Sequence, residues 1–156
     1  MLFRSYCPTV AGVLMFSNCP HEYIPEALIR CTRFKGIAGR DILRIEDITG
    51  SLEQQATKAL EVLTVWLATH YELSGVKLTE QLPIPKVALR EAIINAVLHR
   101  KYSIPGAIKI AIYDNRIELF SPGDFPGLVD LNSLGDGTTY LRNPIFSQAR
   151  ISYAFN

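Results

Sequence analysis

The sequence predicts an α+β fold in which two helices pack on a mixed β-sheet. Apolar residues recur at helical spacing over residues 51–72 and 86–100, and alternating apolar and polar residues flank these two segments. The chain has 156 residues, of which 48% are hydrophobic and 20% charged, so it can bury a core, and disorder is excluded. This length fits one domain, or one domain with a remnant of another.

The first fifty residues have a strand-like pattern. We expect strands at residues 10–16, 27–34 and 42–45, because short apolar or alternating runs are separated by residues typical of turns. Five cations lie within or beside the second and third of these strands: Arg30, Arg33, Lys35, Arg40 and Arg44. They are compatible with a solvated strand face or with an edge that binds phosphate, and the second alternative predicts salt-sensitive binding of duplex DNA.

Helical signals begin at Ser51. This residue is a predicted N-cap, and Gln54 occupies the capping-box position three residues later. Residues 74–82 are a predicted connector or short strand, and Pro85 suits the first turn of the second helix because that position needs no N–H. Alternating segments at 107–113 and 116–120 predict a β-hairpin, and the Gly- and Pro-rich stretch that follows predicts a long functional loop.

The second helix carries one polar stripe on an otherwise apolar sequence. Glu91, Asn95 and His99 are spaced four residues apart, so their side chains project from one face. This face either looks at solvent or lines a pocket for a polar ligand, because unpaired burial of such groups is costly. In a pocket, the carboxylate can take a proton from water and the amide oxygen can coordinate Mg²⁺.

Several segments together resemble a known family. They are residues 88–103, the hairpin at 108–119, the Ser-Pro-Gly at 121–123 and the Leu-Arg-Asn-Pro at 141–144. In this order they resemble a bacterial and archaeal family described as ATP-dependent DNA helicase RecG-related proteins or transcriptional regulators. Its members resemble a Schlafen/AlbA-like DNA-binding domain fused to a histidine-kinase-type (GHKL) ATPase-like domain. Residues 8–16 and 25–36 resemble the closing strands of the first domain, so the likeness spans residues 8 to about 146.

The resemblance implies a domain division and a Bergerat-like fold. Residues 1–50 would be a small β-rich remnant of the DNA-binding domain, and residues 51–156 would be a GHKL ATPase-like domain truncated at its lid. It also implies ATP and Mg²⁺ as cofactors. Glu91 would be the catalytic acidic residue, whose carboxylate orients or deprotonates the attacking water, and Asn95 would be the magnesium and phosphate ligand. The other implied nucleotide-binding residues are His99, Ser121, Gly123, Gly135, Gly137, Arg142 and Asn143.

This sequence also departs from the family pattern. Ser121 stands where the family has Asn and true GHKL ATPases have Asp, and Lys101 stands where the family has Asp. ATP hydrolysis is therefore left open, and the alternative is a non-enzymatic dimerisation or interaction module that has lost its pocket. No G-x-x-x-x-G-K-[ST] motif is present, so we expect no helicase motor in this polypeptide.

Charge, cysteine content and hydropathy limit the partners. Sixteen Lys and Arg against fifteen Asp and Glu leave a formal charge of +1, so the chain has no overall positive charge that would attract DNA. We therefore expect DNA as a partner of the full-length parent. The three cysteines include no C-x-x-C pair, which is typical of reduced thiols and a cytoplasmic protein. No apolar run approaches the roughly 20 residues that cross a bilayer. We expect a nucleotide ligand, a homo-oligomer as a further option, and no membrane.

Overall fold

The computed structural model describes residues 7–39, 41–68, 70–74, 77–81, 83–124 and 141–148. Within these residues, a four-stranded sheet has the order β2-β1-β5-β6. It contains β1 (Ile29–Phe34), β2 (Ile42–Ile48), β5 (Ile108–Ile112) and β6 (Ile117–Phe120). Since β1 is antiparallel to β2 but parallel to β5, while β5 and β6 are antiparallel, the sheet is mixed. The predicted α+β fold with helices on a mixed sheet is confirmed.

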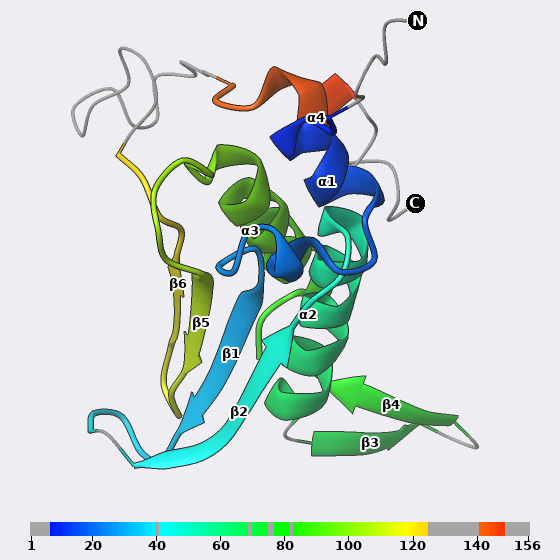
Figure 1. Ribbon diagram of the computed structural model, residues 1–156. Helices are drawn as coiled ribbons and strands as arrows, with labels where there is room; N and C mark the ends of the chain where they lie inside the picture. Colours follow the sequence, from blue (N-terminus) through cyan, green and yellow to red (C-terminus); the bar gives the residue numbers. More distant parts are fainter. Residues whose placement is uncertain are drawn as a thin grey trace, which may run out of the picture.

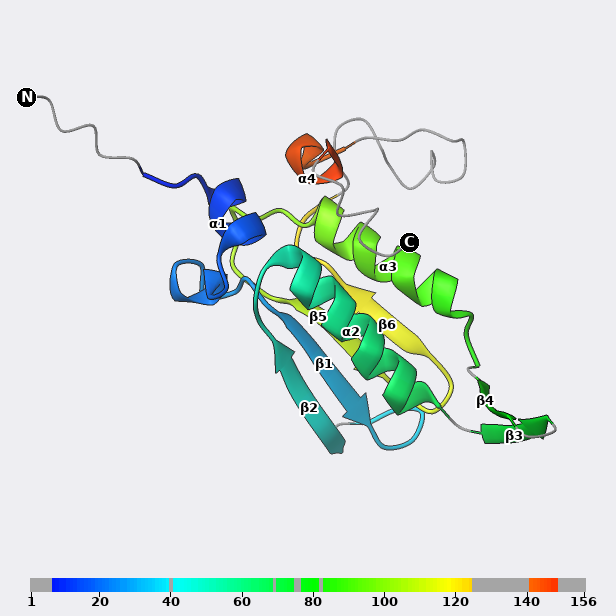
Figure 2. The same ribbon diagram turned by 90° about the vertical axis from the view of Figure 1, so that its right-hand side faces the viewer.

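Two long helices cover one face of this sheet. Figure 2 shows α2 (Leu52–Leu67) and α3 (Lys86–His99) side by side on that face, with α2 over the centre of the sheet. Alternate strand residues pack beneath them, including Ile29, Ile110 and Ile112, none more than 1% exposed. The apolar spacing that predicted both helices thus supplies the core between two layers.

The start of α2 follows the predicted capping box. The Ser51 hydroxyl accepts from the Gln54 backbone N–H at 3.4 Å, and the Gln54 side chain accepts from the Ser51 N–H at 2.9 Å. Gly50 precedes them at φ +107°, where an added Cβ would lie 2.6 Å from the Gln54 side-chain oxygen. Glycine is therefore required for this entry to the helix.

One predicted strand and one predicted helix end were wrong. Residues 10–16 form helix α1 (Val10–Phe16) rather than a strand, because Thr9 caps it through a 3.1 Å bond from the Gly12 N–H. Leu14 is fully buried in this helix, and the apolar residues all round it hid the helical period. Helix α2 ends at Leu67, before the expected residue 72, since β3 (His70–Ser74) pairs with β4 (Lys77–Gln81) in a separate hairpin.

The remaining elements are short. A 3₁₀ turn (Pro20–Glu22) leads into β1, and α4 (Pro144–Gln148) lies near α1 at the top of Figure 1. Pro85 occupies the N-cap of α3, one residue before the predicted first-turn position. None of the helices in the described ranges is long and apolar enough to cross a membrane.

The predicted boundary at residue 50 lies between β2 and α2. The sheet includes β1 and β2 from one side of this boundary and β5 and β6 from the other. A buried side chain also crosses it, since Gln55 on α2 donates to the carbonyl of Ala27 at 3.0 Å and to that of Gly50 at 2.7 Å. The assignment of the two segments to two ancestral domains stays a prediction.

Candidate functional site

The polar stripe of α3 faces away from the core. Leu89, Ile93 and Val97 are at most 3% exposed on the opposite side of the helix. Glu91 and Asn95 are exposed, and His99 is half-buried at the C-terminal end. The Glu91 carboxylate lies 3.9 Å from the Arg90 guanidinium, which is a long ion pair. The stripe therefore presents a carboxylate and an amide that a ligand can reach.

The C-terminal end of α3 is bonded by side chains from three other segments. The last four carbonyl groups of a helix lack partners within the helix. Ser121 donates its hydroxyl to the Ala96 carbonyl at 2.7 Å, and Tyr102 donates its hydroxyl to the Val97 carbonyl at 3.1 Å. Asn143 donates its amide to the carbonyls of Leu98, at 2.8 Å, and Arg100, at 2.9 Å. These bonds fix residues 121 and 143 against the helix.

Arg100 lies fully buried just beyond the helix. Its guanidinium donates to the Gly106 carbonyl at 2.8 Å and lies 4.5 Å from the centre of the Tyr102 ring. Burial lowers the pKa of Arg100, while its interactions with the Tyr102 hydroxyl and with Glu26 oppose that shift. Burial also raises the pKa of Tyr102, so its hydroxyl keeps the proton that it donates. Arg100 thus orders the chain that leaves α3.

His99 faces a second cluster, formed by Arg142, Gly123 and Asp124. Arg142 donates to the Asp124 carbonyl, and the Lys101 N–H donates to the Pro122 carbonyl at 2.8 Å. Gly123 has φ +132°, and an added Cβ would lie 2.9 Å from the Lys101 Cβ and 3.6 Å from the Arg142 guanidinium carbon. Only glycine lets these segments approach so closely. We call His99, Gly123, Asp124 and Arg142 the α3-end cluster.

Two polar atoms of the α3-end cluster are buried without a partner among the described residues. They are Nδ1 of His99 and Nε of Arg142. Burial lowers the pKa of His99, and the positive charge of Arg142 lowers it further. The neutral imidazole offers one nitrogen that donates or accepts a hydrogen bond, and the guanidinium beside it offers several N–H donors. Such a set fits an anionic ligand, which would also offset the unpaired burial.

The structure brings together most of the predicted site residues. Ser121, Gly123, Arg142 and Asn143 meet at the last turns of α3, next to His99, although they come from two separate segments. Asn95 lies one turn before His99, and Glu91 one turn earlier. Gly135 and Gly137 lie outside the described residues. The sequence pattern did not indicate the structural contacts of Arg100 and Tyr102, although both residues lie within the segment 88–103 that resembles the family.

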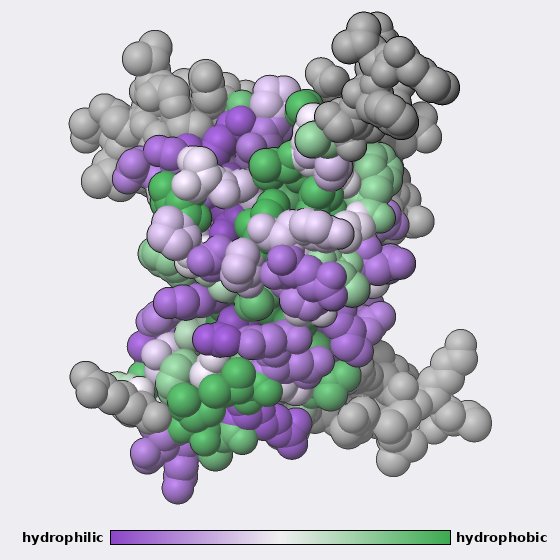
Figure 3. All heavy atoms as spheres, in the orientation of Figure 1, coloured by the Kyte–Doolittle hydropathy of each residue, from purple (hydrophilic) through white to green (hydrophobic). Residues whose placement is uncertain are grey.

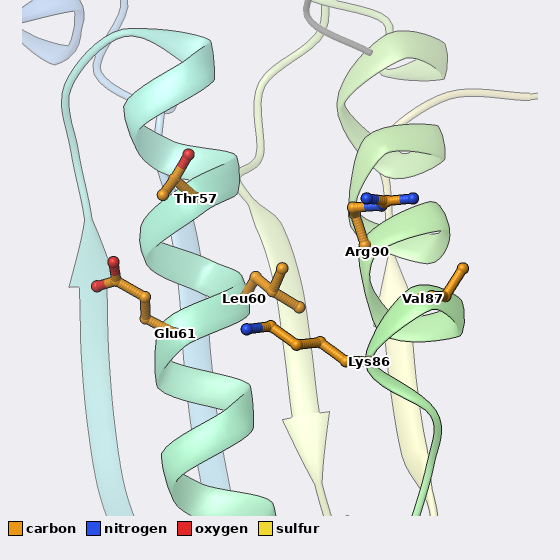
Figure 4. A pocket seen from close by; sticks show the side chains of 6 residues that line it. All are labelled: Thr57, Leu60, Glu61, Lys86, Val87 and Arg90. Atoms are coloured by element: carbon orange, nitrogen blue, oxygen red, sulfur yellow. The ribbon is translucent and has the colours of Figure 1, made fainter. Parts of the chain in front are cut away.

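A separate groove lies between α2 and α3. It has a volume of about 410 Å³ and is lined by Thr57, Leu60, Glu61, Lys86, Val87 and Arg90. Figure 4 shows the Lys86 side chain reaching from α3 towards Leu60 on α2. None of the predicted nucleotide residues that the structure describes lines this groove, so it is distinct from the α3-end cluster.

The cationic strands at the N-terminal side are partly neutralised. Arg30 forms two bonds of 2.6 Å with the Asp47 carboxylate, and this pair raises the pKa of Arg30 and lowers that of Asp47. Arg33 bonds the Asp114 carboxylate at 2.6 Å and the Tyr113 carbonyl at 2.8 Å. Arg40 lies outside the described residues. Two of the five predicted phosphate-binding cations are therefore held by carboxylates, which reduces their attraction for duplex DNA.

Comparison with known proteins relates part of this chain to an ATPase-like family. A family described as "Putative ATP-dependent DNA helicase recG C-terminal" matches residues 106–153, which include Ser121, Gly123, Arg142 and Asn143 but not α3. No curated protein matches the chain. The fold is similar to that of the DIP2311 protein from Corynebacterium diphtheriae, with a TM-score of 0.71 and 22% identity. The similarity covers 92% of this chain but only 28% of that one, so this chain corresponds to a fraction of the larger protein. The family match supports an ATPase-like module related to the RecG C-terminal region, and the structural similarity shows the fold.

Proposed function

We propose that the chain binds a nucleotide, ATP with Mg²⁺, through the polar stripe of α3 and the α3-end cluster. The observation that carries this proposal is the pair of buried nitrogens, on His99 and Arg142 beside Gly123, that have no partner among the residues that the structure describes. They lie where the family-matched segments meet the helix. Phosphate oxygens are strong acceptors for a guanidinium and for N–H groups in a glycine-containing loop. The proposed protein scaffold is GHKL-like.

Each proposed role uses a described side chain. The exposed Asn95 amide oxygen is a hard ligand suited to Mg²⁺, which also keeps several waters. Arg142 would contact a phosphate oxygen through the donors that Asp124 leaves unused. The Glu91 carboxylate is accessible and would take a proton from a water molecule during hydrolysis. Gly135 and Gly137 would add backbone N–H groups on the phosphate side.

We propose a DNA-associated regulatory role for the full-length parent, on the basis of the family resemblance. In this arrangement residues 1–50 derive from a Schlafen/AlbA-like domain and the nucleotide site reports the ATP state to it. Unwinding by this polypeptide is outside the proposal, because its 156 residues contain no phosphate loop of the kind that helicase motors use.

Titration with ATP, with and without Mg²⁺, tests the nucleotide proposal by NMR. We expect amide shifts at Asn95 and Gly123, and a Mg²⁺ dependence that Asn95→Ala removes. Asn18→Ala is the matched control, because Asn18 is also an exposed asparagine but lies far along the chain in the loop before the 3₁₀ turn. Absence of any shift at millimolar nucleotide would refute the proposal. Released phosphate, compared between the wild type and Glu91→Gln, then separates binding from hydrolysis.

One observation favours a second candidate, a non-enzymatic interaction module. The Ser121 hydroxyl donates its proton to the Ala96 carbonyl, so at the position where true GHKL ATPases have Asp there is a short neutral side chain that is bonded to α3. This candidate predicts partner contacts that do not change with nucleotide. The NMR titration with ATP distinguishes the two, since only the first candidate predicts nucleotide-dependent amide shifts at Asn95 and Gly123.

A further inference from the structure

Strand β2 lies at an edge of the four-stranded sheet and has exposed apolar side chains. It pairs with β1 on one side, and no described strand lies on its other side (Figure 2). Ile42, Leu43 and Ile45 are 51–55% exposed, and Ile37 nearby is 60% exposed. Figure 3 shows apolar surface gathered at the lower end of the sheet, where β2 begins. An edge with free N–H and carbonyl groups and apolar side chains can accept another strand.

The charges on β2 are arranged symmetrically about Ile45. Arg44 precedes it and Glu46 follows it. In an antiparallel pair of two β2 strands centred on Ile45, Arg44 of each copy lies opposite Glu46 of the other. Register with β1 places Glu46 opposite the buried Cys31, so Arg44 and Glu46 share the helix-covered side of the sheet. Both cross-strand pairs are therefore on one side, within reach of each other.

The two neighbouring symmetric registers are unfavourable. When two copies of one strand pair antiparallel about a two-fold axis, the residue at the axis lies opposite the same residue of the other copy. That residue defines the register. Centring on Arg44 places two guanidinium groups opposite each other, and centring on Glu46 places two carboxylates opposite each other. Like charges directly opposite are destabilising, whereas the register at Ile45 makes two opposite-charge pairs and one apolar pair. Charged residues on an edge strand usually prevent association. On β2, the order of Arg44 and Glu46 instead favours pairing with a second copy of β2.

We propose that β2 pairs with β2 of a second copy of this chain, antiparallel and centred on Ile45, to form a continuous eight-stranded sheet. The two-fold axis is perpendicular to the sheet, so α2 and α3 of both copies lie on the same face. Arg44 and Glu46 are available for this contact, because neither forms an ion pair with another residue of the described part. The Asp47 carboxylate stays with Arg30 of its own chain, on the opposite side of the sheet. This proposal does not depend on nucleotide binding.

A pair of charge reversals tests the proposed register. Arg44→Glu leaves acids at positions 44 and 46, and Glu46→Arg leaves cations at both. Each variant alone should weaken self-association by about tenfold or more, because two attractive pairs become two repulsive ones. An equimolar mixture of the two variants should restore dimers, now of one copy of each. Sedimentation velocity measures all three samples, with circular dichroism to show that each variant is folded.

Two further variants complete the test. Ile45→Lys places two cations at the two-fold axis and should abolish dimers without disturbing the core, since Ile45 is 55% exposed. Lys109→Glu is the matched control: it also reverses an exposed charge on the sheet, but on the central strand β5, and should leave the dimer unchanged. A wild-type chain that stays monomeric at every concentration would overturn the proposal. So would dimers that persist in Arg44→Glu and Ile45→Lys.

Discussion

The N-terminal end of α2 and the C-terminal end of α3 are capped in contrasting ways. Ser51 and Gln54 cap α2 through two bonds within four residues of sequence. The end of α3 receives its bonds from Tyr102, Ser121 and Asn143, the last of which comes 43 and 45 residues after the carbonyls that it contacts. A local cap stabilises one helix. A distant cap also fixes the position of the segments that supply it.

This difference has a functional consequence. Asn143 is adjacent to Arg142, and Ser121 lies two residues before Gly123, so the bonds that cap α3 also position the α3-end cluster. Ser121 and Asn143, which the resemblance implies as nucleotide contacts, therefore also cap the end of α3. Losing the cap of α2 should affect stability alone, whereas losing the cap of α3 should affect both stability and ligand binding.

The largest effect is expected for Asn143→Ala. This change removes the donors to two carbonyl groups, in a half-buried position, and should lower the free energy of unfolding by about 1–3 kcal/mol. It should also weaken any nucleotide-dependent NMR shift at Gly123. Urea unfolding measures the first effect. Asn18→Ala, at an exposed asparagine, is the control and should stay within about 0.5 kcal/mol of wild type.

A smaller and purely local effect is expected for Ser51→Ala. Loss of an N-cap side chain costs about 1 kcal/mol of unfolding free energy. Nucleotide-dependent shifts at Gly123 should be unchanged, because the Ser51 side chain bonds only Gln54 among the contacts described. The double variant with Asn143→Ala should show additive losses, since the two caps share no partner. Strong coupling between the two substitutions would contradict the separation of local and distant caps.

The smallest effect is expected from protonation of His99. Its pKa is lowered in the folded chain, by burial and then by Arg142, from the ordinary value of 6.5. As the pH falls below that value, the unfolded chain takes up a proton before the folded chain does, so stability decreases until folded His99 is also protonated. His99→Gln should remove this part of the pH dependence of urea unfolding. An unchanged profile, or an NMR midpoint for His99 above 6.5, would exclude it.

Much of the fold could be predicted because its signals are local. The capping box at Ser51, the apolar spacing of both long helices and the alternation in β1, β5 and β6 each depend on residues close in sequence. The sequence predicted a strand in place of α1, because apolar residues occupy every side of this helix and no period of about 3.6 residues is visible. The end of α2 was missed because the β3–β4 pairing, which is a tertiary choice, takes residues that continue the helical pattern.

The candidate site could be predicted only in part. The spacing of Glu91, Asn95 and His99 places them on one face of α3, and the structure agrees. No local pattern indicates that the Asn143 amide bonds two carbonyl groups at the end of α3, or that Arg100 is fully buried beside Tyr102. These contacts join segments far apart in sequence, so they depend on the completed packing of the molecule rather than on any single motif.

The parallel pairing of β1 with β5 also constrains the order of folding. Ile29 lies beside Ile108, although the hairpin of β1 with β2 closes within twenty residues. During synthesis, the inner edge of β1 therefore waits for most of the chain to emerge, with Ile29 and Cys31 lacking their final neighbours. Such a strand is open to mispairing over that interval. A short time between translation of β1 and of β5, or a chaperone that covers β1, would favour the native sheet.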